Sequence, residues 1–182
     1  VTLTKEDQEL EGKKIVRKVM QEWINASEAL IEMIICHLPS PRVAQKYRTL
    51  YLYEGPMDDE CAKGMMTCDP NGPFMMFVSK MVPSNDGGRF YAFGRVFSGK
   101  AECSKKVKIM SPNYAPGKNE ERFEKNIQRV VLMMGRRAED VYDVPCGNTC
   151  ALVGVDSCII KQATISDSAN ACIIRSMKYS VS

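Results

Sequence analysis

The apolar and polar positions of the first forty residues repeat with the period of an α-helix. Residues 6–23 are expected to be helical and place large apolar side chains on one face: Ile15, Val16, Val19, Met20 and Trp23. Asn25 and Glu28 have capping-box spacing, which predicts the start of a second helix with the stripe Leu30, Ile31, Ile34, Ile35 and Leu38. Pro39 and Pro41 are expected to end it. We interpret both stripes as packing faces.

Proline and glycine then interrupt the pattern, so residues 39–73 are interpreted as a connector with one short helix at 58–66. From Phe74 onward the pattern becomes that of short β-strands separated by turns. The predicted strands are 74–82, 89–97, 106–110, 127–134, 151–155 and 177–181. The fold class is therefore mainly β: a small antiparallel barrel (residues 74–182) preceded by two helices and a connector (residues 1–73).

Composition adds a charge asymmetry that the net value of +3 hides. Residues 80–137 contain 13 Lys/Arg and 5 Asp/Glu, a local charge of +8, whereas residues 1–60 carry −3 and residues 138–182 carry −2. A basic segment between acidic ends is typical of a protein with an anionic partner such as a phosphate backbone. No apolar run approaches the roughly 20 residues that cross a bilayer. Both ends are expected to be cuts within a longer protein.

The eight cysteines lie in apolar or strand-like runs, and we expect buried, reduced thiols rather than disulfides. With a single histidine in the chain, no zinc site is expected. That histidine, His37, follows Cys36 directly, and neighbouring residues on a helix point about 100° apart, so they do not form a catalytic pair.

One segment nearly matches a phosphate-binding loop. Residues 94–101 fit the glycine and lysine positions of the pattern, but Ala101 replaces the hydroxyl residue that would hold magnesium. The segment is also predicted to connect two strands, whereas a phosphate loop leads into a helix N-terminus. We therefore expect no nucleotide site and no catalytic residues in this chain.

Basic and aromatic residues alternate in the predicted strand at 89–97, which is a pattern found in RNA-binding proteins. Because neighbouring strand residues face opposite ways, at least one set of aromatics must be core. Contacts of Lys and Arg with phosphates are therefore favoured over base stacking.

Several longer strings occur in order along almost the whole chain: HLPSP (37–41), QKYR (45–48), EGPMDDE (54–60), CDPNGP (68–73), SKMVP (79–83), GRFYAFGRVFSG (88–99), NYAPGK (113–118), VPCGN (144–148) and GVD (154–156). Together they closely resemble the family of eukaryotic translation elongation factor 2, the GTP-dependent ribosomal translocase. Residues 25–27, 100–104 and 166–175 depart from the family pattern.

The resemblance implies that residues 1–73 are the end of the family's GTPase domain with its connector, and that residues 74–182 are its second domain. Such a segment would be non-catalytic and cytoplasmic, with the ribosome (small-subunit RNA) and the remaining domains of the same protein as partners, no membrane, and a monomeric state. GTP and magnesium would belong to the full-length parent. The RNA-binding candidates are Arg89, Arg95, Lys106, Lys108, Arg129 and Arg136.

Two alternatives stay open. The spliceosomal paralogue of this GTPase contains the same barrel, although the strings at 45–48 and 113–118 favour the translocase. An independent enzyme with a cysteine nucleophile would need a base beside a thiol of low pKa.

Overall fold

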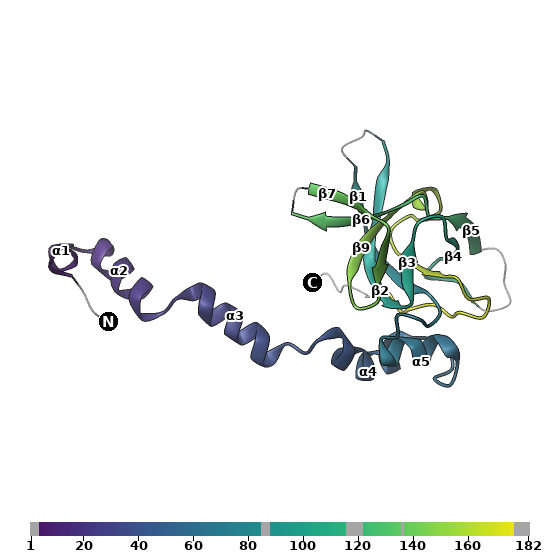
Figure 1. Ribbon diagram of the computed structural model, residues 1–182, viewed down its shortest axis with the longest axis horizontal. Coiled ribbons are helices and arrows are strands. Elements are labelled where there is room, and N and C mark those ends of the chain that lie inside the picture. The colour runs from purple at the N-terminus through teal and green to yellow at the C-terminus, as the bar shows by residue number, and fades with distance from the viewer. Residues whose placement is uncertain (1–3, 85–87, 116–121, 136, 177–182) are drawn as a thin grey trace. The chain divides into compact units, whose positions relative to one another are not determined.

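The computed structural model describes residues 4–84, 88–115, 122–135 and 137–176, and the chain divides into two compact units, Val1–Ser40 and Pro41–Ser182 (Figure 1). The first unit is helical, with α1 (Lys5–Gln8), α2 (Lys13–Trp23) and α3 (Ala26–His37). The prediction of one continuous helix over residues 6–23 is wrong. Gly12 has a φ of 61°, which an α-helix cannot accommodate, and it separates α1 from α2.

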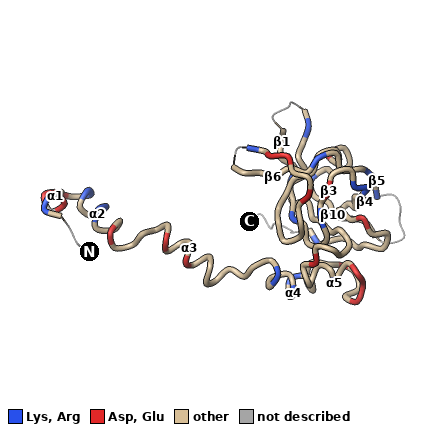
Figure 2. The backbone as a smooth tube through the Cα atoms, viewed as in Figure 1, with Lys and Arg blue, Asp and Glu red and all other residues tan. Residues whose placement is uncertain are grey.

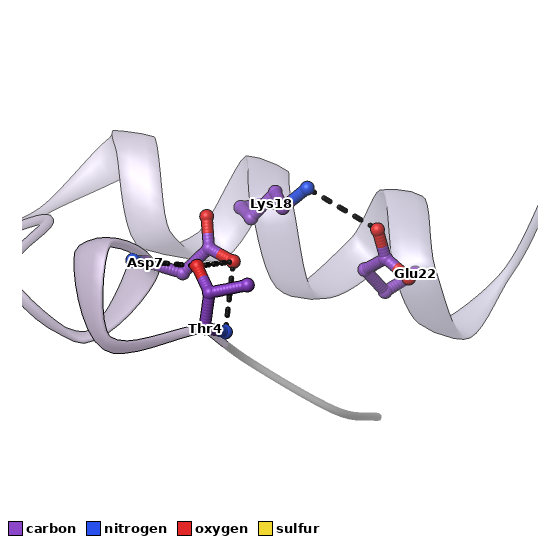
Figure 3. Close-up of polar contacts among 4 residues, drawn as sticks. All are labelled: Thr4, Asp7, Lys18 and Glu22. Atoms are coloured by element: carbon purple, nitrogen blue, oxygen red, sulfur yellow. Dashed lines mark hydrogen bonds and ion pairs between the residues drawn. The ribbon is translucent and has the colours of Figure 1, made fainter.

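Side chains form a hydrogen-bonded pair at the start of α1, whereas α2 and α3 have no side-chain cap. The Thr4 hydroxyl donates to Asp7 Oδ2 at 2.7 Å, and the Asp7 N–H donates back to Thr4 Oγ1 at 3.3 Å (Figure 3). Hydrogen bonds from Thr4 lower the pKa of Asp7. The capping box expected at Asn25 is absent, because the Asn25 side chain accepts from the Ser27 hydroxyl at 2.7 Å and caps no backbone N–H.

The apolar stripes of α2 and α3 are present but are not covered. Neither helix contains a buried residue, and the Trp23 side chain is 67% exposed. Lys18 and Glu22, one turn apart on α2, form an ion pair at 3.2 Å (Figure 3). The interpretation of these stripes as packing faces stays a prediction.

The second unit begins with two helices, α4 (Pro41–Leu52) and α5 (Glu60–Thr67). The short helix predicted at 58–66 is confirmed as α5, and Asp59 caps it by accepting the Ala62 N–H through Oδ1 at 2.5 Å. The interpretation of residues 39–57 as connector is wrong for α4. Pro41 is the first residue of that helix, a position where its missing N–H is no disadvantage.

An antiparallel sheet forms the rest of the unit, in the order β5-β4-β10-β1-β2-β9-β6-β7, and a two-stranded sheet pairs β3 with β8. The strands are β1 (Met75–Pro83), β2 (Phe90–Ser98), β3 (Lys100–Glu102), β4 (Lys106–Met110), β5 (Arg122–Asn126), β6 (Arg129–Met134), β7 (Arg137–Val141), β8 (Asp143–Pro145), β9 (Thr149–Val153) and β10 (Ala163–Ser166), with a 3-10 turn η1 (Asp156–Cys158). The mainly β, antiparallel fold class is confirmed.

The large sheet wraps around one apolar core (Figure 1). Met76, Ala92 and Ile165 point inward from β1, β2 and β10 and are fully buried. Backbone hydrogen bonds extend the β4–β5 ladder to Ile127, which donates to the Lys105 carbonyl at 3.0 Å and accepts from the Ser104 N–H at 2.8 Å. The next residue, Gln128, already donates to the Val153 carbonyl at 2.9 Å beside the β6–β9 pairing, so the chain passes directly from one end of the sheet toward the other. The result is barrel-like.

A second apolar cluster joins α5 to the outside of β1 and β2. Met65 packs there with Met75, Phe77 and Phe97, and Gln45 on α4 donates through Nε2 to the Met65 and Phe97 carbonyls. Residues 41–67 are therefore packed with the barrel. The assignment of residues 1–73 to the end of a GTPase domain stays a prediction.

The predicted strands at 74–82, 89–97, 106–110, 127–134 and 151–155 correspond to β1, β2, β4, β6 and β9, with shifts of up to two residues at their ends. The strand predicted at 177–181 lies outside the described residues. Five strands were missed: β3, β5, β7, β8 and β10. None of the described helices is long and apolar enough to span a bilayer.

Candidate nucleic-acid interface

The near-match to a phosphate loop has the strand–turn–strand context that the sequence predicted, since it runs from β2 through Gly99 into β3. Gly99 has a φ of 67°, and its N–H donates to the Asp69 carbonyl at 2.8 Å, so this N–H is already used within the fold. Gly94 allows close strand contact, because an added Cβ would lie 2.0 Å from the Phe77 carbonyl oxygen. Turn conformation at Gly99 and close strand packing at Gly94 therefore explain why both positions are glycine.

The cysteines are all free thiols in the structure. Burial raises the pKa of Cys150 to about 12, and burial also raises the pKa of Cys61 and of Cys172. A raised pKa disfavours the thiolate that a nucleophile needs. Within the described parts of the chain, no three His, Cys, Asp or Glu side chains gather as a metal site would require.

The RNA-binding candidates lie on several strands rather than in one patch (Figure 2). Arg89 precedes β2, Arg95 lies on β2, Lys106 and Lys108 lie on β4, and Arg129 lies on β6. In the sheet order, β4 is separated from β2 by β10 and β1, so the two lysines are not adjacent to Arg95. Arg136 lies outside the described residues.

Acidic neighbours distinguish the candidates from one another. Lys106 Nζ pairs with Glu124 Oε2 at 2.7 Å, and Arg129 Nη1 pairs with Asp140 Oδ2 at 3.0 Å. Hydrogen bonding to Lys106 lowers the pKa of Glu124. Such exposed pairs contribute little to stability, so they can open, but each carboxylate also repels a phosphate.

Arg89, Arg95 and Lys108 have no ion-pair partner among the described residues. Arg95 is exposed and Lys108 is half-buried. Glu124 lies opposite Lys108 in the strand register, yet its carboxylate pairs with Lys106 and Arg122. These three cations are thus the candidates most open to a phosphate.

The aromatic residues of β2 contribute mainly to packing. Ala92 and Val96 point into the core, and Tyr91 and Phe93 point outward, where they pack half-buried against Val131 and its neighbours. Phe97 is buried in the cluster beneath α5. Phe90 is 45% exposed and is the most accessible ring on this strand. The preference for phosphate contacts over base stacking agrees with this burial.

Sequence reasoning missed Lys80, which lies on β1 between Ser79 and Met81. Its Nζ lies 5.8 Å from the centre of the Phe93 ring, and the two residues are register partners in the β1–β2 hairpin. Arg95 is two residues from Phe93 on the same outer face. We call Lys80, Phe93 and Arg95 the hairpin patch. Only the register of the hairpin reveals that Lys80 belongs there.

The comparison with protein families agrees with the architecture. Residues 73–168 match the family model described as elongation factor G domain 2. The match begins two residues before β1 and ends two residues after β10, so it spans every strand of the barrel and slightly more than half of the chain. The chain therefore belongs to the family of elongation factor G domain 2.

Proposed function

We propose that this chain is the second-domain segment of a eukaryotic-type, GTP-dependent ribosomal elongation factor and that it docks on small-subunit ribosomal RNA. The observation that carries the proposal is the family match over residues 73–168, which makes a ribosome-associated role in translation the natural one. The local charge of +8 over residues 80–137 supports an RNA partner. The strings at 45–48 and 113–118 favour the translocase over its spliceosomal paralogue.

Within this proposal, Arg95 and Lys108 make phosphate contacts and are helped by Arg89 and Lys80. Lys106 and Arg129 contribute less, because each must first exchange a carboxylate for a phosphate. Arg136 keeps its place among the candidates on the resemblance alone. The segment itself holds no nucleotide and performs no catalysis. GTP, magnesium and hydrolysis belong to a longer, cytoplasmic parent protein, and the segment is monomeric.

The test is binding of the purified chain to isolated small ribosomal subunits over a salt series. Affinity should fall as salt rises, because phosphate contacts release counterions. Arg95→Gln and Lys108→Gln should each weaken binding and reduce the salt slope by about 1. Lys63→Gln is the matched control, since Lys63 is an exposed lysine on α5 outside the basic segment.

Salt-independent binding, or equal losses for Arg95→Gln and Lys63→Gln, would refute the docking role. A GTP-binding assay should run in parallel with magnesium present. Tight binding of GTP to this chain would refute the proposal that the segment has no nucleotide site. Preferential binding to small nuclear RNA over small ribosomal subunits would instead favour the spliceosomal paralogue.

A further inference from the structure

Two cysteines from distant parts of the sequence adjoin each other beside the β2–β3 turn. Cys68 ends α5, and Cys146 lies between β8 and β9. Gly99 connects both segments, because its N–H donates to the Asp69 carbonyl at 2.8 Å and its carbonyl accepts the Cys146 N–H at 3.0 Å. A Cβ placed on Gly147 would lie 3.3 Å from Cys68 Sγ. The Cys68 sulfur therefore lies beside the residue that follows Cys146.

The backbone at Cys68 is unusual for a side chain that only fills space. Its φ of 52° and ψ of 53° put this helix C-cap in the left-handed region, where glycine is the ordinary residue. A cysteine that adopts this costly conformation, where glycine would not be strained, suggests that its side chain has a function. Cys68 is 5% exposed and Cys146 is half-buried, so an oxidant in solvent reaches Cys146 first.

We propose that Cys68 and Cys146 are an oxidative modification site, at which a small peroxide converts the two thiols into a reversible disulfide. The Cys146 thiolate attacks one peroxide oxygen, forming a sulfur–oxygen bond as the oxygen–oxygen bond breaks and hydroxide leaves. The Cys68 sulfur then attacks this sulfenic sulfur, forming the disulfide as the second hydroxide leaves. Two thiol protons convert the two hydroxides into water, so each disulfide consumes one hydrogen peroxide.

The reaction should be slow at neutral pH and accelerate in base. Burial, followed by the interaction with the Cys68 side chain, raises the pKa of Cys146 to about 12. Below that value the thiolate fraction, and with it the rate of disulfide formation, should rise about tenfold for each pH unit. Oxidation at this site therefore needs sustained peroxide.

The disulfide would join α5 to the β8–β9 turn and close a long loop that contains β1 to β8. Closing a loop of this length restricts the unfolded chain strongly, provided that the native geometry is unstrained. We expect the oxidised chain to melt on the order of 10 °C higher than the reduced chain. The proposal does not depend on ribosome docking.

The experiment uses the purified full chain with all thiols reduced, treated with hydrogen peroxide and digested without reductant. The expected result is a peptide pair that links Cys68 to Cys146, with the mass of two hydrogen atoms lost and full reversal by dithiothreitol. Cys68→Ser and Cys146→Ser should each abolish the linked peptide. Cys36→Ser is the control that should retain it, because Cys36 is exposed in the first unit.

The wild-type chain decides the question even if a serine variant fails to fold. The proposal is overturned if peroxide leaves both cysteines unlinked or over-oxidises them separately. It is also overturned if the mapped disulfide joins Cys61 to Cys172, the two cysteines that flank Tyr53. If the Cys68–Cys146 link is mapped but the melting temperature does not change, the predicted stabilisation by the disulfide is wrong.

Discussion

Replacing Gly94 with alanine should destabilise the barrel because two backbones approach each other too closely for a methyl group. An added Cβ would lie 2.0 Å from the Phe77 carbonyl oxygen and 2.8 Å from the Val78 Cα. Both are backbone atoms of the paired strand β1, so no side-chain rotation relieves the clash. The strands must separate by roughly an ångström before the contact becomes tolerable, which weakens the β1–β2 ladder at the centre of the sheet. Overpacking costs about 1–3 kcal/mol, and each weakened hydrogen bond adds about 1 kcal/mol.

We therefore expect Gly94→Ala to lower the free energy of unfolding by about 3 kcal/mol, measured by urea denaturation followed by circular dichroism. The same loss corresponds to a melting temperature lower by roughly 6–12 °C. Gly135→Ala is the matched control, because Gly135 has a φ of 63° and open space around it. Its cost is the left-handed strain of about 1–2 kcal/mol alone. A smaller loss for Gly94→Ala than for Gly135→Ala would refute the steric reasoning.

Three further predictions concern the same unit. The Tyr53 hydroxyl donates to Asp59 Oδ2 at 2.5 Å, and Asp59 also caps α5. Asp59→Ala should therefore lower the free energy of unfolding by about 2–3 kcal/mol, because both interactions are lost. If the losses of Asp59→Ala and Tyr53→Phe add up in a double-mutant cycle, the two side chains are not coupled and the reasoning is wrong. Burial raises the pKa of Cys150 from 9.0 to about 12, so its contribution to stability is present below pH 9 and is lost as pH rises toward 12. Cys150→Ala should remove its share, about 1.4 kcal/mol per pH unit, of the decline in the free energy of unfolding measured by urea denaturation. Ile165→Ala should cost about 3 kcal/mol by leaving a core cavity, whereas Ile160→Ala, at a side chain 92% exposed, should change the melting temperature little.

The elements that the sequence predicted are those whose apolar positions repeat clearly. β1, β2, β4, β6 and β9 alternate or form apolar runs, because their inward side chains fill one core. β5 and β7 were missed because they lie at the two ends of the sheet, where all of their residues are at least partly exposed and most are polar. α4 was missed because Pro41 was interpreted as a helix stop, although the same proline suits the first position of a helix.

For the candidate interface, the sequence predicted only which segment is rich in Lys and Arg. The sequence located the basic segment, but it did not show which cations face acidic partners. The Arg129–Asp140 pair depends on β6 pairing with β7, and β7 has no recognisable strand pattern. Lys80 was likewise hidden, because its approach to Phe93 follows from a register with an irregularity between Val78 and Lys80. Pairing across strands is not encoded in the spacing of either strand alone.

Local ion pairs determine which of the basic residues in 80–137 are available to bind a phosphate. Lys100 and Lys105 pair with Asp143 and Asp167, which come from the acidic C-terminal segment, and Lys106 and Arg122 share Glu124. At physiological salt, charges interact over only about 8 Å, so a paired lysine presents little net field to a distant phosphate. The excess charge is therefore concentrated on unpaired residues such as Arg95 and Lys108 rather than spread over the whole segment. A double variant that neutralises both Lys100 and Asp143 should consequently affect RNA binding less than a variant that neutralises Arg95 alone.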